Sequence, residues 1–321
     1  YLEHDESISY AGKNIGTVAN KHPQAVWERV PVMAVLFRHP TAGYILYDTG
    51  NCPGDEKDRL SQAMRNNIYF DIKREDFIDY RLGQLGLTPA DIDMLILSHS
   101  HHDHNGGLGF FSFTKAGRNV ITYEKDYVNA LKETHQFYDK EDYVFIKENM
   151  HFDGISYQLI EGDQELVEGI EAIELPGHTP AVLGLVVHLE NETVIFPSDA
   201  VYTAKNYGPP AIAPGIVYDS LGFQKSVEKL RRLQRIMQRH RGVRIRRRVD
   251  NNRRATRAGT LNLIHQRTLM IRLHKLNIKT MIRRALTHHT LNIVQSGVAV
   301  HLGAALPKQV QIRSIKHKNR I

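Results

Sequence analysis

Four side chains that can bind metal ions lie within six positions of one short segment, LILSHSHHDHNGG. They are His99, His101, Asp103 and His104. Imidazoles and carboxylates are ligands that zinc and similar divalent ions take in proteins. The apolar run MLIL (94–97) just before them has the length and composition of a buried strand. The segment therefore predicts a metal site at the end of a strand, which explains the spacing better than a solvated polar loop does.

Two further candidate ligands follow strand-like segments later in the chain. The apolar alternation in EAIELPGH is followed by a Pro-Gly turn and then His178. The strand-like segment ETVIFPSDA carries Asp199 near its end. A single histidine after a turn is more often structural. Because the chain already carries the cluster at 99–104, we expect both residues to be ligands.

Other polar residues near these segments have less direct roles. His188 lies inside an expected strand, and His102 fills a variable position of the motif, so neither is counted as a ligand. Asp48 in YDTG is either a turn carboxylate or a group that orients a ligand histidine. Cys52 is the single cysteine, which excludes an internal disulfide and a cysteine-based zinc site.

The spacing of the ligands predicts two neighbouring metal ions. Imidazoles two positions apart on an extended loop point the same way and can share an ion. We expect one ion between His99, His101 and His178, and a second that Asp103 and His104 face and Asp199 bridges. Two ions about 3.5–4 Å apart can hold one hydroxide between them. The ligand set predicts a hydrolytic site with zinc, and iron and manganese remain alternatives.

The segments that carry these residues predict a mixed α/β domain. Two strands around the turn PTAG form an expected hairpin, and Gly106 and Gly107 allow the backbone to approach the site closely. The apolar stripe from Phe223 to Leu233 predicts an amphipathic helix. The expected strands are 31–40, 43–50, 94–97, 171–178, 181–189 and 192–200, and the expected helices are 74–87, 123–133 and 221–240.

The charge of the chain changes sharply near residue 231. The 321 residues have a formal net charge of +7, but residues 231–321 hold 23 Lys+Arg, a single acid and no Phe, Tyr or Trp. A globular domain of that size rarely lacks aromatic residues. We therefore divide the chain into a hydrolase-like domain, 1–238, and a basic, aromatic-free tail, 239–321, whose fold the pattern does not predict.

Two interpretations of the tail are open. A basic segment can neutralise phosphates, so a nuclease or another nucleic-acid-binding protein is a competing function. The tail could instead be a non-native end, as a frameshift would produce, which would leave a folded but metal-poor remnant. The abrupt change of composition favours the second interpretation. The tail also has no aromatic side chains to stack on bases, so we expect no nucleic-acid partner.

The ligand segments SHSHHDHNGG, PGHTP and SDA follow one another in the same order as the motifs of the metallo-β-lactamase superfamily, which they resemble. The resemblance covers roughly residues 30–238. The sequence is most similar to the quorum-quenching N-acyl homoserine lactonase group, which has a tyrosine three residues after the bridging aspartate, here Tyr202. The resemblance implies an αβ/βα sandwich, with two mixed sheets face to face, helices outside, and two zinc ions at one edge.

The resemblance also implies a mechanism. A hydroxide that bridges the metals attacks the lactone carbonyl, Tyr202 donates a hydrogen bond to the oxyanion, and Asp103 protonates the leaving alkoxide. A packing role for Tyr202 is the alternative. Other hydrolases of this fold, such as glyoxalase II-like thioesterases and β-lactamases, lack this tyrosine, which favours a lactonase.

One ligand of the family pattern is missing. The lactonases take another histidine for the second metal from a GHD-like turn after the last long helix, and the window QRHRGVRIRRRVDNNRR contains no GHD. His240 lies there among arginines, which repel a cation. The second metal site is therefore expected to be one ligand short. The C-terminal histidines His265, His274, His288, His289 and His301 have no motif around them.

The expected partner is a small lactone or ester, and dimers of similar proteins favour a homodimer. No apolar run approaches the roughly 20 residues of a membrane helix. No signal peptide is visible, although the sequence begins at Tyr1 and not at Met, so we expect a cytoplasmic protein.

Overall fold

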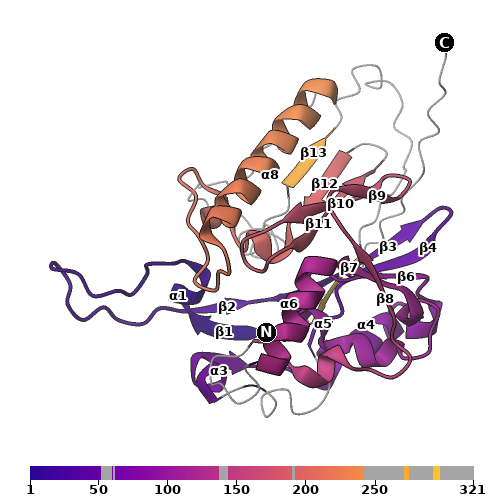
Figure 1. The fold of residues 1–321 in the computed structure, drawn as a ribbon, viewed down its shortest axis with the longest axis horizontal. Helices are drawn as coiled ribbons and strands as arrows, with labels where there is room; N and C mark the ends of the chain where they lie inside the picture. The colour runs from indigo at the N-terminus through magenta and orange to yellow at the C-terminus, as the bar shows by residue number, and fades with distance from the viewer. Residues whose placement is uncertain are drawn as a thin grey trace, which may run out of the picture.

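Two β-sheets that lie face to face form the centre of the molecule in the computed structural model (Figure 1). The structure describes residues 1–51, 60, 62–136, 144–189, 192–241, 271–274 and 292–296. The inner faces of the two sheets share a hydrophobic core that includes Phe37, Ile45, Leu185 and Phe196. Burial of these apolar side chains from both sides is what holds the sheets together.

The first sheet has the order β14-β3-β4-β6-β7-β8. Its β3 and β4 form the predicted antiparallel hairpin, and β4, β6, β7 and β8 run parallel. The strands are β3 (Val32–His39), β4 (Gly43–Tyr47), β6 (Met94–Ile96), β7 (Val120–Tyr123), β8 (Tyr157–Ile160) and β14 (Asn292–Ser296).

The second sheet is antiparallel and has the order β13-β12-β11-β10-β9. Its strands are β9 (Gln164–Val167), β10 (Ile170–Leu175), β11 (Val182–His188), β12 (Glu192–Phe196) and β13 (Ile271–His274). All six strands predicted from the sequence are confirmed, most of them with tighter bounds, because polar and turn residues end the pairing before the apolar pattern stops.

Helices cover the outer faces of both sheets (Figure 1). On the second sheet, α8 (Ser220–Arg241) buries Phe223, Val227 and Leu230. On the first sheet, α4 (Ile78–Gly83) buries Ile78 and Leu82. The other α-helices are α1 (Glu6–Ser9), α3 (Gln62–Asn67), α5 (His102–Asn105), α6 (Glu124–Gln136) and α7 (Ala204–Tyr207). The αβ/βα sandwich is confirmed.

The predicted helix at 74–87 is only partly right. It begins as a 3₁₀ turn, η1 (Arg74–Asp76), and the extended backbone of Phe77 separates this turn from α4. The Asp76 carboxylate accepts a hydrogen bond from the Lys73 amide and so closes the first turn by itself. A local side-chain bond therefore interrupts a segment whose apolar spacing alone looked continuous.

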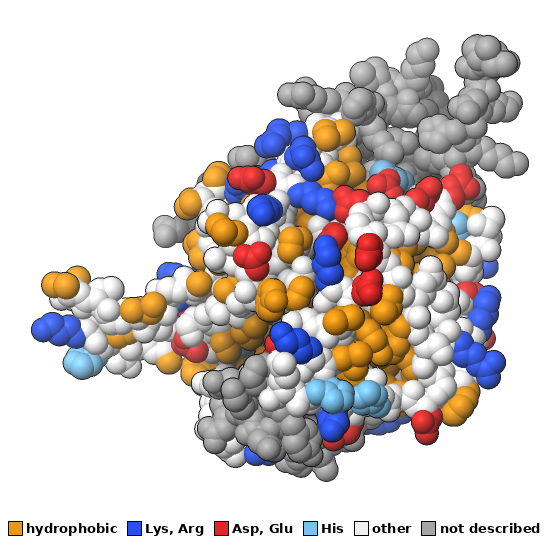
Figure 2. Space-filling view, viewed as in Figure 1, with side chains coloured by type: hydrophobic (Ala, Val, Ile, Leu, Met, Phe, Trp, Pro, Cys, Tyr) orange, Lys and Arg blue, Asp and Glu red, His pale blue; other side chains and the backbone are white. Residues whose placement is uncertain are grey.

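A third, small sheet was not anticipated from the sequence. It has the order β2-β1-β5, with β1 (Leu2–Asp5), β2 (Trp27–Val30) and β5 (Ile68–Phe70). The loop between α1 and β2 projects from the body and exposes apolar side chains, including Ile15 and Val18 (Figures 1 and 2). The strands are short and far apart in sequence, so no local sequence pattern predicts that they pair.

The predicted boundary at residue 238 falls inside α8. Beyond that helix, the backbone of β13 pairs with β12 and the backbone of β14 pairs with β3. The rest of the predicted tail lies outside the described residues, and so does Cys52. Of the C-terminal histidines, only His240 and His274 are described, and for these two only the backbone.

Candidate metal centre

Four strands end at the same edge of the sandwich. β4 and β6 are parallel neighbours, so their carboxyl ends lie together. β10 and β12 are each antiparallel to β11 and therefore also run in one direction. Across the two sheets, the Leu183 amide donates to the Ser98 carbonyl at 2.7 Å, and the Tyr47 hydroxyl donates to the Leu183 carbonyl at 2.5 Å. The residues that follow these strands are therefore brought to one place, where open α/β sheets bind their ligands.

The histidine loop after β6 is anchored by the backbone after β4. The Thr49 amide and hydroxyl both donate to the His104 carbonyl, at 2.8 and 2.9 Å. A Cβ atom on Gly107 would lie 2.4 Å from the Thr49 carbonyl oxygen. The predicted close backbone approach is therefore confirmed at Gly107, and any larger residue there would push the loop away from β4.

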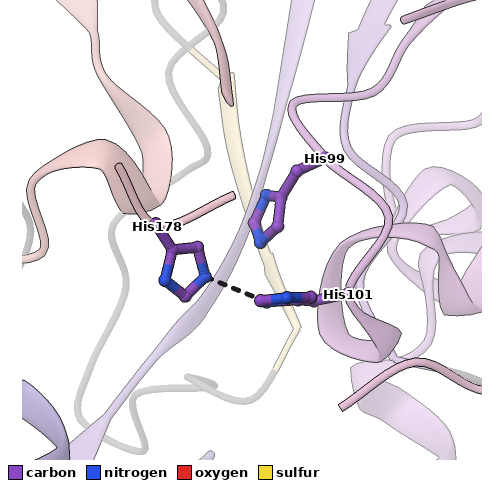
Figure 3. Close-up of side chains that lie close together, drawn as sticks. All are labelled: His99, His101 and His178. Carbon is purple, nitrogen blue, oxygen red and sulfur yellow. Dashed lines mark hydrogen bonds between the residues drawn. The ribbon is translucent and has the colours of Figure 1, made fainter. Parts of the chain in front are cut away.

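Two overlapping groups of side chains converge at this edge. In each group the potential ligand atoms lie within 4.8 Å of one another. The first group, His99, His101 and His178, is drawn in Figure 3, where Nε2 of His178 and Nδ1 of His101 are 2.9 Å apart. The second group is His99, His104 and Asp199.

Asp199, a member of the second group, also lies near the first. Its Oδ2 atom is 3.9 Å from Nε2 of His99, 3.5 Å from Nε2 of His178 and 3.4 Å from Nε2 of His104. Burial alone would raise the pKa of Asp199, but the imidazoles of His104 and His178 hold it below its ordinary value. The carboxylate is therefore ionised and central, as a bridging ligand needs to be.

The donor set fits a divalent cation. Nε2 of His99 is buried without a hydrogen-bond partner in the described structure, and an unpaired buried nitrogen is costly unless something binds it. Burial holds the pKa values of His99, His101 and His178 below the ordinary value, so these rings are neutral and offer lone pairs. Neutral imidazoles and a carboxylate are a suitable set for zinc.

Asp48 orients His104. The Asp48 carboxylate accepts from the Ser98 amide at 2.7 Å, from the Ser98 hydroxyl at 2.8 Å and from Nδ1 of His104 at 2.9 Å. The hydrogen bond to Nδ1 turns Nε2 of His104 towards Asp199, and Nε2 is the atom that carries the lone pair when the ring is neutral. Burial lowers the pKa of His104, but the carboxylates of Asp103, Asp199 and Asp48 outweigh burial and raise it. Of the two interpretations of Asp48, the orienting one therefore matches the contacts.

Asp103 and Tyr202 border the same centre. Asp103 is half-buried, and its Oδ2 lies 3.6 Å from Nε2 of His104. The Tyr202 hydroxyl lies 3.0 Å from Nδ1 of His178, which also contacts the Ile216 carbonyl at 2.9 Å. Burial, with Asp199 and Asp103 nearby, raises the pKa of Tyr202 well above its ordinary value, so the phenol keeps its proton.

Asp126, in the first turn of α6, is a supporting residue that the sequence did not suggest. Its buried carboxylate accepts a hydrogen bond from Ser100 Oγ at 2.7 Å, and Ser100 lies between His99 and His101. Burial raises the pKa of Asp126 to about 6, although the hydrogen bond from Ser100 opposes this rise. Asp126 therefore braces the loop that carries His99 and His101. In the sequence, the only indication of Asp126 is its place among the polar residues at the start of a helix.

A cleft opens over the centre and encloses about 1120 Å³ of empty space, including the part open to solvent. Its polar floor consists of His101, Asp103, His104, His178, Asp199 and Tyr202. Its apolar wall consists of Leu2, Ile8, Val30, Val32, Met64 and Ile68. His102 also lines the cleft and lies against Phe70, with ring centroids 5.7 Å apart. The cleft therefore suits a ligand with one polar and one apolar end.

The sequence matches the description Metallo-beta-lactamase superfamily over residues 27–236. The chain belongs to the metallo-β-lactamase superfamily. The match covers the strand ends and both ligand groups described above. In the described residues, no helix is long and apolar enough to cross a membrane.

Several relatives of this chain are named N-acyl homoserine lactonase. N-acyl homoserine lactonase AiiB of Agrobacterium fabrum is 32% identical over 213 residues, which are 63% of this chain and 74% of that protein. N-acyl homoserine lactonase AiiA of Bacillus thuringiensis subsp. kurstaki is 32% identical over 169 residues, 51% of this chain and 62% of that protein. A structure of an N-acyl homoserine lactone hydrolase with N-hexanoyl-L-homoserine at its catalytic metal center has a TM-score of 0.58 and 26% identity, covering 73% of this chain and 85% of that one.

The structure thus brings all seven predicted site residues to one edge of the sandwich. His188 lies away from them and contacts Glu171 and Thr193, which agrees with its interpretation as a strand histidine. The side chain of His240, the candidate for the missing ligand, lies outside the described residues.

Proposed function

We propose that this protein is a metal-dependent hydrolase that opens the ring of N-acyl homoserine lactones. The names of its 32% identical relatives support this substrate class, as does the related structure with an opened product at its metal center. The observation that carries the proposal is the position of Tyr202 beside the predicted ligands.

We assign the metal-binding role to His99, His101, His178, Asp103, His104 and Asp199. The convergence of the two ligand groups and the unpaired nitrogen of His99 support this assignment. Zinc ions bound there would supply a water-derived nucleophile at neutral pH and a Lewis acid for the carbonyl. Two ions are proposed, and the ligand from the missing GHD turn is left open.

Tyr202 would stabilise the carbonyl oxygen of the substrate. Nδ1 of His178 contacts the Ile216 carbonyl, which can only accept, so this nitrogen carries a proton. The Tyr202 oxygen then accepts from the same N–H, and its own proton is left for another acceptor. The proton that a tyrosine of raised pKa retains is what an oxyanion needs as charge develops on it.

Asp103 would protonate the leaving alkoxide. When the ring opens, the ester C–O bond breaks and the ring oxygen needs a proton to become the hydroxyl of the product. Asp103 is half-buried, lines the cleft and lies at the edge of the second ligand group, where it can take a proton from water and pass it on.

The domain division and the partners are part of the proposal. The family match ends at residue 236, which supports the proposed catalytic domain of residues 1–238, and the backbone of β13 and β14 would add one strand from the tail to each sheet of that domain. We propose a homodimer that acts in the cytoplasm on a small lactone, with no nucleic-acid partner.

The test is a substrate panel with a matched pair of tyrosine variants. Zinc-loaded protein is assayed on N-hexanoyl-homoserine lactone, a glutathione thioester and a chromogenic β-lactam. We expect turnover of the lactone, a fall in its kcat of roughly 10²-fold for Tyr202→Phe, and no change for Tyr69→Phe, a residue that is 59% exposed. A panel in which the thioester or β-lactam is preferred, or an unchanged Tyr202→Phe, would refute the assignment.

A further inference from the structure

One polar side chain lies within the apolar part of the cleft. In β1, Leu2 and His4 are both buried, whereas Glu3 and Asp5 on the opposite face are half-buried. His4 pairs with Ile68 of β5, and Leu2 pairs with Val30 of β2. All four residues line the cleft. Among these strand residues, His4 alone can form hydrogen bonds through its side chain.

The hydrogen bonding of His4 fixes which ring nitrogen is the acceptor. Nδ1 lies 3.0 Å from the Asp5 carbonyl oxygen. A carbonyl oxygen can only accept, so Nδ1 carries the proton and the neutral ring has its lone pair on Nε2. Nε2 has no hydrogen-bond partner among the described residues, yet it is not one of the fully buried unpaired atoms. Its remaining exposed surface therefore faces the cleft that the ring lines.

His4 and the polar floor border the same open space. Asp199, Tyr202 and His4 line one cleft. His4 therefore lies where the polar floor meets the apolar wall.

A ligand that fills this cleft must donate a hydrogen bond to Nε2 of His4. A ligand that leaves Nε2 without a donor binds with lower affinity than one that supplies it. In the open cleft, water can donate to Nε2. An apolar chain laid along Leu2, Val30 and Ile68 would expel that water, and an acceptor left unpaired costs roughly tenfold or more in affinity. A packing role alone would be served as well by an apolar residue, like the three that surround His4.

We propose that His4 is a specificity-determining residue that accepts a hydrogen bond from the amide N–H of an N-acyl lactone. The inference rests on the proposed function and deepens it. In such a ligand the amide nitrogen is attached to the ring carbon next to the lactone carbonyl. It therefore lies where the reacting ring meets the acyl chain, as His4 lies where the floor meets the wall. A lactone with a plain alkyl chain on that carbon has no donor for His4.

Binding of two ring-opened acids to the zinc-loaded full chain tests this inference without needing turnover. The first is N-hexanoyl-L-homoserine. The second is the opened acid of α-heptyl-γ-butyrolactone, which carries a chain of similar length on the same carbon but no amide. Calorimetry gives Kd for the wild type, His4→Phe, His4→Gln and His188→Phe. His188→Phe removes a strand histidine outside the cleft, and thermal unfolding and zinc content show that each variant is folded and loaded.

We expect His4→Phe to raise the Kd of N-hexanoyl-L-homoserine about tenfold and that of the alkyl acid by less than about twofold. His4→Gln places an amide oxygen at similar reach and should recover most of the loss, and His188→Phe should change neither Kd. Equal losses for both acids, a His4→Gln variant that behaves like His4→Phe, or a wild type that binds neither acid would overturn the inference. Selective binding without lactone hydrolysis would sustain this role of His4 and refute the proposed reaction.

Discussion

The polar floor and the apolar wall of the cleft are built in different ways. The side chains of the floor follow three strands, β6, β10 and β12, and Asp48, Thr49 and Asp126 hold the histidine loop by hydrogen bonds of 2.7 to 2.9 Å. The wall packs through Leu2, Val32 and Ile68, with Val30 and Met64 partly buried against them.

This difference has a physical consequence. Hydrogen bonds fix the direction of a side chain, so replacing a partner on the floor changes orientation and charge. Apolar contacts are nondirectional and scale with area, so a change in the wall alters affinity gradually. The floor should therefore set whether the reaction occurs, and the wall should set which acyl chain binds.

The largest expected effect concerns the brace behind the floor. The folded-state pKa of Asp126 is about 6, above the ordinary value of 3.8, so the folded protein retains this proton where the unfolded chain has lost it. The contribution of Asp126 to the free energy of unfolding should fall by about 3 kcal/mol as pH rises from 4 to 6 and stay flat above.

Chemical denaturation of metal-free wild type and Asp126→Asn measures this contribution. Chelator is present throughout, so that loss of zinc in acid plays no part. The free energy of unfolding of the wild type minus that of the variant should decline through this pH window. A difference that is flat, or that grows with pH, would contradict the buried-carboxyl interpretation.

Asp48→Asn should weaken zinc binding roughly 10- to 100-fold, because it removes the charge that orients Nδ1 of His104. Competition with a chromophoric chelator measures the affinity. Asp93→Asn is the matched control, since Asp93 also accepts from a backbone amide, that of Tyr44, but lies outside the cleft. Equal zinc affinity in both variants would mean that Asp48 acts only as a turn residue.

The smallest expected effect belongs to the wall. Val30→Ala removes apolar surface from the cleft, so KM for N-decanoyl-homoserine lactone should rise roughly threefold to tenfold with little change in kcat. The short N-butanoyl substrate should be nearly unaffected, and so should Val18→Ala, which alters a side chain that is 98% exposed. A fall in kcat for both substrates would show that the wall also positions the reacting ring.

The sequence predicted the floor better than the wall for a physical reason. His99 to His104 form a local cluster, and His178 and Asp199 each follow a recognisable strand, so spacing and strand ends were sufficient. His4 and Asp126 gain their roles only from contacts across the fold, with Asp126 separated by 26 positions from Ser100. The three-stranded sheet joins segments of three or four residues, which is too short for a periodic pattern.

Metal-dependent acid release from N-hexanoyl-L-homoserine lactone tests the central claim most directly. Zinc-loaded protein, protein stripped by a chelator and protein reloaded with zinc are compared in a pH-stat, with bound zinc measured for each. The proposed function predicts turnover that disappears on stripping and returns on reloading. No acid release from the zinc-loaded protein, or release that survives complete stripping, would contradict it.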